Sequence, residues 1–420
     1  MLSQIKTVLT IILVVLIGVK SPAASEQAPA TYIHAGVLID VKAQEAKSDQ
    51  TIVVSGGMIV DVADGFIKAP EGSKTINLKD ATVLPGLIDA HVHLLISIGP
   101  DTQLKFLTQN DSEATLDGVV NAHATLMAGF TTVQDLGGRS EAIFALRDAI
   151  AKGQVPGPRV LASGDIISPN ASETMISCSG VDECRRVTRA HIIAGADVIK
   201  SQVTGDSVLS IGAPPARFTA EELRAIVETA QSMGRKTVIH AHGTDSINFA
   251  LRQKVHSIEH GTYINNESVR LFRKTGAVLV PTLLAGQVVE GFAANPMAPP
   301  AYRSEASQFT SRMIAATARA HKGGVKIAFG SDAGAPPHGL NAQEFSLMVK
   351  AGLTPMEALR SATIIAAEHL GVENTTGVIE QGKAADIIAV RNRNPLEDVS
   401  VLEAIDFVMK NGVVYKGGDE

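Results

Sequence analysis

The sequence predicts an α/β protein in which eight strand–helix units form a barrel beside a small β domain built from both ends of the chain. The chain has 420 residues, of which 45% are hydrophobic, enough for a barrel-sized domain and a smaller companion. Its middle alternates short apolar runs with amphipathic helices, which is typical of a parallel sheet. Both ends consist of short β-type runs separated by turn residues.

The first 24 residues have the layout of a secretory signal peptide. Lys6 is followed by an almost wholly apolar run from Val8 to Val19 and then by small residues such as Ala23 and Ala24. The apolar run is shorter than the ~20 residues that span a membrane, although an uncleaved anchor is the alternative. We therefore expect residues 1–24 to be removed and the mature protein to be exported, to the periplasm or the medium, without stable membrane association.

The terminal β runs are expected to pair with one another. The runs lie at Ile33–Ile39, Thr51–Val60 and Ala81–Leu84 near the start of the chain, and at Ala385–Val390 and Phe407–Tyr415 near its end. We expect residues 25–84 and 371–420 to form one β domain, and residues 85–370 to form the barrel.

Eight candidate strands lie in the middle of the chain, the number that a closed barrel needs. They are Leu87–His93, Thr131–Asp135, Arg159–Gly164, Asp197–Lys200, Thr237–His240, Ser257–His260, Val278–Thr282 and Ile327–Ser331. Helix signals lie between them. Thr219 with Glu222, and Thr354 with Pro355 and Glu357, have the pattern of helix N-termini.

Four histidines are predicted at the rim of this barrel where active sites lie. His91 and His93 end one strand and are two residues apart, so both rings face the same way. His240 and His260 each end a strand of their own. Each histidine alone could be an ordinary polar residue, but four at one rim favour a metal site.

Lys200 and Asp332 also follow apolar strand residues. Lys200 could extend toward solvent, or its neutral amine could capture carbon dioxide as a carbamate that bridges two divalent cations. Asp332 could be a turn or helix-capping residue, or a metal ligand that accepts a proton from water. The residues alone leave these alternatives open.

An ordered set of motifs resembles the amidohydrolase superfamily, and more narrowly its imidazolonepropionase-like and Xaa-Pro or Xaa-Arg dipeptidase branch. The motifs, within a likeness that runs from about Tyr32 to Tyr415, are Pro85–His93, Gly195–Lys200, Val238–Gly243, Ser257–Gly261, Val280–Leu283, Phe329–Ala333 and Gln381–Ile387.

The resemblance implies a distorted TIM (β/α)8 barrel with a β-sandwich domain, and a centre of two divalent metal ions, zinc being the usual one. On the matching positions His91, His93 and Asp332 would hold the first metal, and His240 and His260 the second. Lys200, carbamylated by CO2, would bridge them. A hydroxide between the metals would attack an amide carbonyl, with Asp332 as proton shuttle. The implied substrate is a dipeptide or an N-acyl amino acid.

Several features leave the substrate open. His242 shares the face of His240 and could replace it as the ligand or touch substrate, while Tyr263 and His338 could reach substrate from loops. Gln134 stands where relatives often carry a basic residue, and the segments 166–179 and 201–206 lack the glycine motifs of many relatives. A cyclic amide, a lactone or a xenobiotic amide is therefore the alternative substrate.

Two rival functions are disfavoured. A deaminase of this fold would carry a glutamate shortly after His240, and residues 241–246 contain none. A barrel that only binds a partner would have gaps in the ligand set, and all six positions carry competent side chains.

Composition limits the partners. The net charge of −6 and the lack of a Lys/Arg cluster argue against nucleic acid and favour a small molecule. A homo-oligomer is left open. Export would allow the only two cysteines, Cys178 and Cys184, to form a disulfide, the alternative being two separate thiols.

Overall fold

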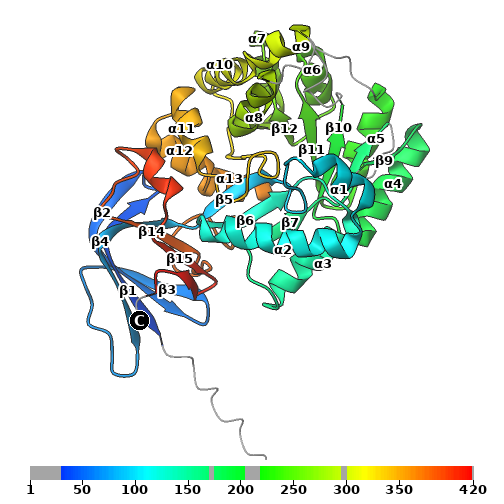
Figure 1. The fold of residues 1–420 in the computed structure, drawn as a ribbon. Helices are drawn as coiled ribbons and strands as arrows, with labels where there is room; N and C mark the ends of the chain where they lie inside the picture. Colours follow the sequence, from blue (N-terminus) through cyan, green and yellow to red (C-terminus); the bar gives the residue numbers. More distant parts are fainter. Residues whose placement is uncertain (1–29, 170–174, 204–217, 295–299, 419–420) are drawn as a thin grey trace, which may run out of the picture.

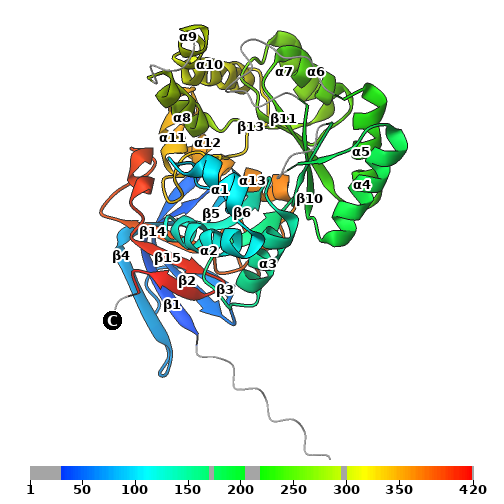
Figure 2. The same ribbon diagram turned by 45° about the vertical axis from the view of Figure 1, so that its right-hand side comes forward.

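The computed structural model describes residues 30–169, 175–203, 218–294 and 300–418. The predicted signal peptide at residues 1–24 lies outside these ranges. Figure 1 shows an α/β body, coloured from cyan to orange, with a β-rich lobe at one side that contains both ends of the described chain. The view in Figure 2 shows the helices of the body lying outside its strands.

The strands of the body pair in parallel, which confirms the predicted α/β class. The first three form the sheet β5–β6–β7, and the next six form the sheet β13–β12–β11–β10–β8–β9. Their bounds are β5 Leu87–Val92, β6 Phe130–Asp135, β7 Arg159–Ala162, β8 Ile166–Ser168, β9 Met175–Ser177, β10 Val198–Gln202, β11 Lys236–Ala241, β12 Ser257–His260 and β13 Val278–Val280. Seven of the eight predicted strands are thus present, and β8 and β9 were not anticipated.

The eighth predicted strand, Ile327–Ser331, is wrong as a regular strand. Only Ile327 makes a bridge, with Leu279 of β13. The N–H of Ala328 still donates to the carbonyl of Leu279, but that of Phe329 donates to the carbonyl of Ser361 and that of Ser331 to the Asp89 carboxylate. These last two bonds interrupt the ladder that a regular strand would need.

The helices of the body are α1 Thr102–Thr108, α2 Asp111–Met127, α3 Ser140–Ala151, α4 Val181–Ala194, α5 Ala220–Ser232, α6 Thr244–Arg252, α7 Asn266–Thr275, α8 Leu283–Ala293, α9 Pro300–Ala306, α10 Phe309–Lys322, α11 Gln343–Lys350, α12 Pro355–Ser361 and α13 Ile364–Leu370. Both predicted N-termini are confirmed: Thr219 caps α5 and Thr354 caps α12, each in a reciprocal box with the glutamate three residues later. In the described part of the chain, no helix is long and apolar enough to cross a membrane.

Strands from both ends of the chain pair in one seven-stranded sheet, ordered β16–β15–β14–β4–β1–β2–β3. The bounds are β1 Thr31–Asp40, β2 Glu45–Ser55, β3 Met58–Asp64, β4 Lys74–Pro85, β14 Ile387–Arg391, β15 Phe407–Lys410 and β16 Val413–Lys416, with the short 3-10 helix η2 Val399–Glu403 before β15. The ends join where Ile388 of β14 lies opposite Leu84 of β4.

Two of the predicted β runs are each split into two strands by a turn. Thr51–Val60 is interrupted at Gly56 and Gly57, whose φ angles are 56° and 80°. Phe407–Tyr415 is interrupted at Asn411 and Gly412, also at positive φ. Such left-handed pairs build tight hairpin turns, so each run becomes a hairpin rather than one strand.

Apolar side chains fill both parts of the molecule. The largest core packs the helices of the α/β body on the parallel strands and includes Phe130, Phe329 and Phe345. A separate core in the β lobe joins strands from both ends, with Ile33 and Ile387 among its members.

Cys178 and Cys184 form a disulfide at the N-terminal side of α4, so the two cysteines are paired rather than separate thiols.

Candidate metal centre

The strand β5 brings His91 and His93 to its C-terminal end, as its alternating side chains predicted. Their ring centroids are 5.3 Å apart. Asp332, in the loop after the Ile327 bridge, places Oδ1 3.5 Å from Nε2 of His91 and 3.2 Å from Nε2 of His93. The three residues expected at the first metal are therefore together.

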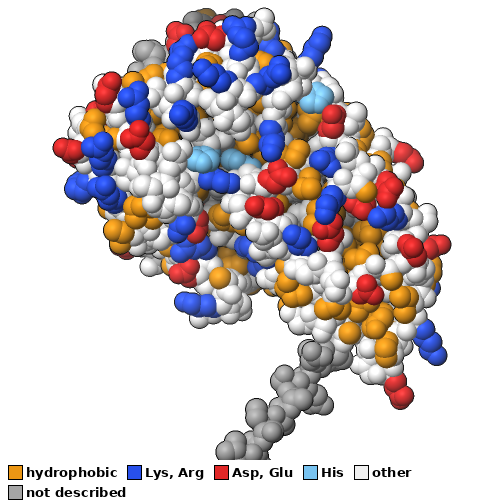
Figure 3. Space-filling model, turned by 180° about the vertical axis from the view of Figure 1, so that it is seen from behind, with side chains coloured by type: hydrophobic (Ala, Val, Ile, Leu, Met, Phe, Trp, Pro, Cys, Tyr) orange, Lys and Arg blue, Asp and Glu red, His pale blue; other side chains and the backbone are white. Residues whose placement is uncertain are grey.

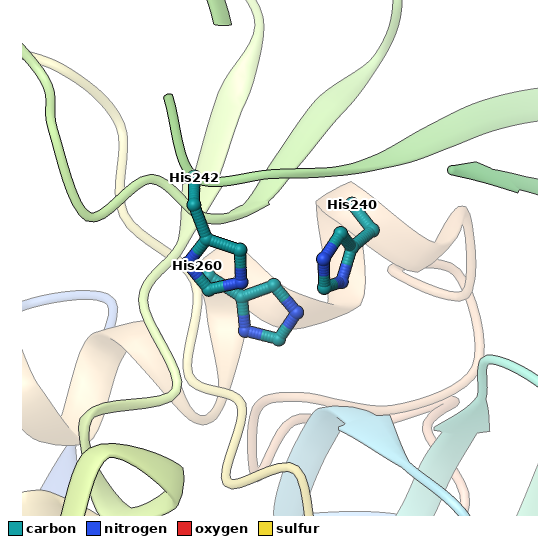
Figure 4. Close-up of side chains that lie close together, drawn as sticks. All are labelled: His240, His242 and His260. Carbon is teal, nitrogen blue, oxygen red and sulfur yellow. The ribbon is translucent and has the colours of Figure 1, made fainter. Parts of the chain in front are cut away.

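His240 and His260 end the neighbouring strands β11 and β12. Their ring centroids are 4.5 Å apart, and the ring planes make an angle of 69°. Ligand atoms of His91, His260 and Asp332 all lie within 4.8 Å of one another, so His260 connects the two groups of histidines. Figure 4 shows the rings of His240, His242 and His260 close together beside the ends of these strands.

Lys200 lies in β10, directly beside the strand that bears His240. Only 2% of its surface is exposed. Burial lowers the pKa of the Lys200 amine, although the nearby carboxylates Glu259, Asp332 and Asp135 act in the opposite sense. The lowered pKa favours the neutral amine, which is the form that reacts with carbon dioxide.

Each of three predicted ligands is oriented by a hydrogen bond to Nδ1. Nδ1 of His91 lies 2.8 Å from Oε2 of Glu259, that of His93 lies 2.9 Å from the carbonyl oxygen of Gly137, and that of His260 lies 2.7 Å from Oγ1 of Thr282. With Nδ1 engaged, Nε2 remains for an ion. Sequence reasoning missed Glu259 and Thr282, although a glutamate inside the apolar β12 pattern was a usable signal.

The donor set fits a divalent cation. Nδ1–H of His91 donates to the Glu259 carboxylate, so Nε2 carries a lone pair that faces Oδ1 of Asp332 at 3.5 Å. A divalent cation bound to both atoms would offset the repulsion between two acceptors at that distance. Burial lowers the pKa of His91 and of His260 well below the usual value, which keeps both imidazoles in the neutral form that binds metal.

Asp332 stays ionised in spite of its surroundings. Burial alone would raise its pKa, but the neighbouring His91 and His93 more than offset this and lower it.

Three residues of the site have an unusual backbone conformation: the φ angles of His260, Thr282 and Asp332 are 72°, 49° and 60°. Side chains other than glycine seldom adopt this conformation, and such strained residues cluster at functional sites.

A second buried carboxylate, Asp89, supports the first group. It accepts hydrogen bonds from the backbone N–H groups of His91 and Ser331, from the Ser331 hydroxyl, and from the side chain of Asn341. Burial raises the pKa of Asp89 to about 6, against the effect of these donors. Asp89 thereby links the strand that carries His91 to the loop that carries Asp332.

His242 lies beside these ligands but has a different orientation from His240. Its ring is stacked on that of His260, with centroids 4.7 Å apart and an interplanar angle of 8°. Nδ1 lies 2.7 Å from Oγ1 of Thr262, and Nε2 is buried without a hydrogen-bond partner among the described residues. Burial, followed by the charge of Lys200, lowers the pKa of His242 to about 3.

The two loop residues singled out in the sequence have defined partners. The phenolic oxygen of Tyr263 accepts a hydrogen bond of 3.1 Å from the guanidinium of Arg312 in α10. Nε2–H of His338 donates to the carbonyl of Ile96, while its Nδ1 lies 3.3 Å from the Thr125 hydroxyl. His338 therefore connects two loops.

On the face seen in Figure 3, acidic and basic side chains are intermixed over the surface.

Known proteins similar to this chain share its architecture. A model of the amidohydrolase family matches residues 82–417. Ochratoxinase from Aspergillus niger is 29% identical over 441 aligned positions, which cover 94% of this chain and 88% of the relative.

Two solved structures have similar folds. The structure of a Xaa-Pro dipeptidase with methionine bound in its active site is 37% identical, with a TM-score of 0.85, and covers 92% of this chain and 100% of its own. A prolidase complexed with N-methylphosphonate-L-proline is 28% identical, with a TM-score of 0.83, over 92% and 99% of the two chains.

Proposed function

This chain belongs to the amidohydrolase family of metal-dependent hydrolases that act on amide bonds, and on that premise we propose that it cleaves a dipeptide or an N-acyl amino acid at a two-metal centre. The observation that carries the proposal is the position of Asp332, whose Oδ1 lies within 3.5 Å of the Nε2 atoms of both His91 and His93. The similarity to a Xaa-Pro dipeptidase over 92% of the chain supports the choice of substrate class.

The proposal includes a closed, distorted (β/α)8 barrel formed by residues 85–370. Hydrogen bonds across both gaps between the parallel sheets support closure. At one gap the N–H of Asp197 donates to the carbonyl of Ala162 in β7. At the other gap the irregular segment 327–331 lies between the sheets: the N–H of Ala328 donates to Leu279 of β13, and the N–H of Ala90 in β5 donates to the carbonyl of Phe329. The proposal also includes a β-sandwich of residues 25–84 and 371–420, in which the single seven-stranded sheet would fold over the one apolar core that strands from both ends share.

We assign His91, His93 and Asp332 to the first metal and His240 and His260 to the second, with carbamylated Lys200 as the bridge. A metal–imidazole bond lies close to the ring plane, so an ion held by two imidazoles lies where their planes meet. The planes of His240 and His260 cross at 69°, which allows a shared ion. The stacked planes of His242 and His260 do not meet at the site, which supports His240 as the partner of His260.

Two divalent ions, zinc being the expected metal, would polarise the amide carbonyl and make a water molecule acidic enough to attack it at neutral pH. Ionised Asp332 would take the proton from that water on a carboxylate oxygen. It would then deliver the proton to the nitrogen of the leaving amine. Glu259 and Asp89 would hold His91 and the Asp332 loop in place throughout.

We further propose that the mature enzyme acts outside the cytoplasm. The basic, apolar and small-residue segments of the first 24 residues support export. The disulfide between Cys178 and Cys184 is in keeping with an oxidising compartment. Detection of the processed chain in the periplasmic or extracellular fraction would test this part of the proposal.

The activity is tested by incubating the zinc-loaded mature protein with a library of dipeptides and N-acyl amino acids and measuring the released amine. A chelator-treated sample is the control. We expect cleavage that the chelator abolishes. If no member of the library is cleaved, the substrate proposal is wrong. The similarity to ochratoxinase then favours the second candidate, a xenobiotic amide, cyclic amide or lactone at the same centre.

A further inference from the structure

His242 is a buried histidine for which the proposed metal centre has no use. It follows β11, two residues after His240, and its side chain lies against the other histidines in Figure 4. Only 4% of its surface is exposed. Its Nε2 has no hydrogen-bond partner in the described chain, and a buried polar atom of this kind needs an explanation such as a catalytic role, a bound water or an ion.

His242 is poorly placed to bind the ion that His260 would hold. The two rings are nearly parallel, so no point close to them lies in both ring planes. The proposed second site also has three protein ligands already, from His240, His260 and the Lys200 carbamate. A catalytic metal site keeps its next position open for water or substrate, and a fourth protein ligand would close it.

The position of His242 nevertheless brings it to the reacting groups. One ring nitrogen from each of His240, His242 and His260 lies within 4.8 Å of the other two. An oxygen atom that enters between them would therefore be within hydrogen-bonding reach of His242. Phe309 of α10 covers the ring at a centroid distance of 5.7 Å and helps to exclude water, which strengthens a hydrogen bond formed there.

We infer that His242 is a catalytic residue that donates a hydrogen bond from Nε2 to the carbonyl oxygen of the scissile amide. This inference rests on the proposed function. The oxygen gains negative charge as water attacks the carbonyl carbon, so the hydrogen bond strengthens in the transition state. No proton is transferred, because Nε2 keeps its hydrogen throughout.

Thr262 is the positioning residue for this donor. Its hydroxyl lies 2.7 Å from Nδ1 of His242 and, by donating to that nitrogen, leaves the single hydrogen of a neutral imidazole on Nε2. Backbone hydrogen bonds also hold the segments of His242 and Thr262 side by side. The N–H of Tyr263 donates to the carbonyl of His242 at 3.0 Å, and the N–H of Gly261 donates to the carbonyl of Ala241 at 3.1 Å.

Three histidine variants and two variants of Thr262 test the inference on the full chain. His242→Phe keeps an aromatic ring that can stack on His260 but removes both nitrogens. His242→Gln restores an N–H donor, and His240→Phe is the matched control at a proposed ligand. Metal content, kcat, KM and the affinity for N-methylphosphonate-L-proline, whose tetrahedral phosphorus resembles the attacked carbon, are measured for each.

We expect His242→Phe to keep both metal ions, to lose about 100-fold in kcat with little change in KM, and to bind the phosphonate more weakly. His242→Gln should recover part of kcat, and His240→Phe should lose an ion. Thr262→Val should lower kcat at unchanged metal content, with recovery in Thr262→Ser. Recovery by serine separates orientation of the ring from a merely structural role.

Two results would overturn the inference. Loss of an ion from His242→Phe, as from the control, would make His242 a ligand, and wild-type kcat with wild-type phosphonate affinity would leave it without a catalytic role. A wild-type enzyme that neither cleaves the library nor binds the phosphonate would overturn the proposed function, and this inference with it. That failure appears in the wild type, before any variant is compared.

Discussion

Nδ1 of His91 lies 2.8 Å from Oε2 of Glu259, a carboxylate that belongs to the strand β12 of the other parallel sheet. Both side chains are buried, and the other carboxylate oxygen of Glu259 accepts a hydrogen bond from the Ser257 hydroxyl. Burial raises the pKa of Glu259, while the charge of Lys200 opposes the rise. Because the carboxylate accepts the hydrogen of Nδ1, it determines that Nε2 of His91 presents its lone pair to Asp332 and to the proposed metal centre.

Replacing Glu259 with glutamine should weaken metal binding by about 10- to 100-fold, because the amide no longer imposes this tautomer. Metal affinity, measured by competition with a chelator, checks the expectation. Glu267→Gln, which changes an exposed partner of Arg252, is the control and should leave the affinity unchanged. Equal affinities in both variants would show that Glu259 does not orient the ligand.

Replacing Lys200 with alanine should abolish both the bridging metal and the activity, since it removes the amine that would form the carbamate. Elemental analysis and amine release measure the two losses. The wild type should also give a carbamate signal by carbon NMR after growth with labelled bicarbonate. Lys326→Ala, at an exposed ion pair with Glu368, is the control. A Lys200→Ala enzyme that retains metal and activity would end the carbamate proposal.

The sequence could predict that the proposed ligands lie close together because strand periodicity and strand ends are local properties. His91, His93, His240 and His260 follow apolar strands, and parallel strands end at the same rim. Asp332 was found in the same way, although its strand proved to be an irregular segment whose backbone bonds to Ser361 and Asp89. These hydrogen bonds depend on residues that are distant in the sequence, so a local sequence pattern cannot predict them.

The supporting residues could not be paired from the sequence. Glu259 and His91 are 168 residues apart, and Thr282 and His260 are 22 apart, so their contacts depend on how neighbouring strands align. The relation of His242 to His240 was also undetermined, because residues two apart share a face. The ring of His242 makes an angle of 8° with that of His260, whereas the ring of His240 makes an angle of 69° with it. Both angles depend on side-chain packing alone.

Replacing Asp332 with asparagine should give a folded protein that keeps much of its metal but has little turnover. The amide oxygen can still bind an ion, whereas the amide cannot accept and return a proton. Metal analysis, circular dichroism and kcat provide the three measurements. Asp80→Asn, at an exposed ion pair with Arg391 in the β lobe, is a suitable control. Wild-type turnover in Asp332→Asn would remove this residue from the mechanism.

His338 should make stability depend on pH below neutrality. Burial lowers its pKa from 6.5 to about 4, although the carbonyl of Ile96 favours the charged ring. Its stabilising contribution is therefore complete above pH 6.5 and is lost as the pH falls toward 4, because the unfolded chain takes up the proton first. The loss is at most about 3 kcal/mol.

The denaturation midpoints of the wild type and of His338→Gln, compared from pH 7 to pH 4, measure this effect. The two midpoints should converge as the pH falls. Parallel curves would mean that His338 has the same pKa in the folded and unfolded chains.

The disulfide between Cys178 and Cys184 should stabilise the fold without affecting the metal centre. It joins cysteines six residues apart. Closing so short a loop lowers the entropy of the unfolded chain and so stabilises the fold by about 2 kcal/mol. Both cysteines are buried, and the N–H of Cys178 bonds to the carbonyl of Ser168 in β8, which keeps this segment in place after reduction.

The reduced enzyme, unfolded in urea with reductant present, should therefore have a lower unfolding midpoint than the oxidised enzyme. Its metal content and kcat under native conditions should stay unchanged. The double variant Cys178→Ser, Cys184→Ser should behave like the reduced enzyme and should not respond to reductant. Because β8 pairs with β10 beside Lys200, through Ile167 and Ser201, a loss of metal on reduction would instead show that the disulfide holds the strand that carries the bridging lysine.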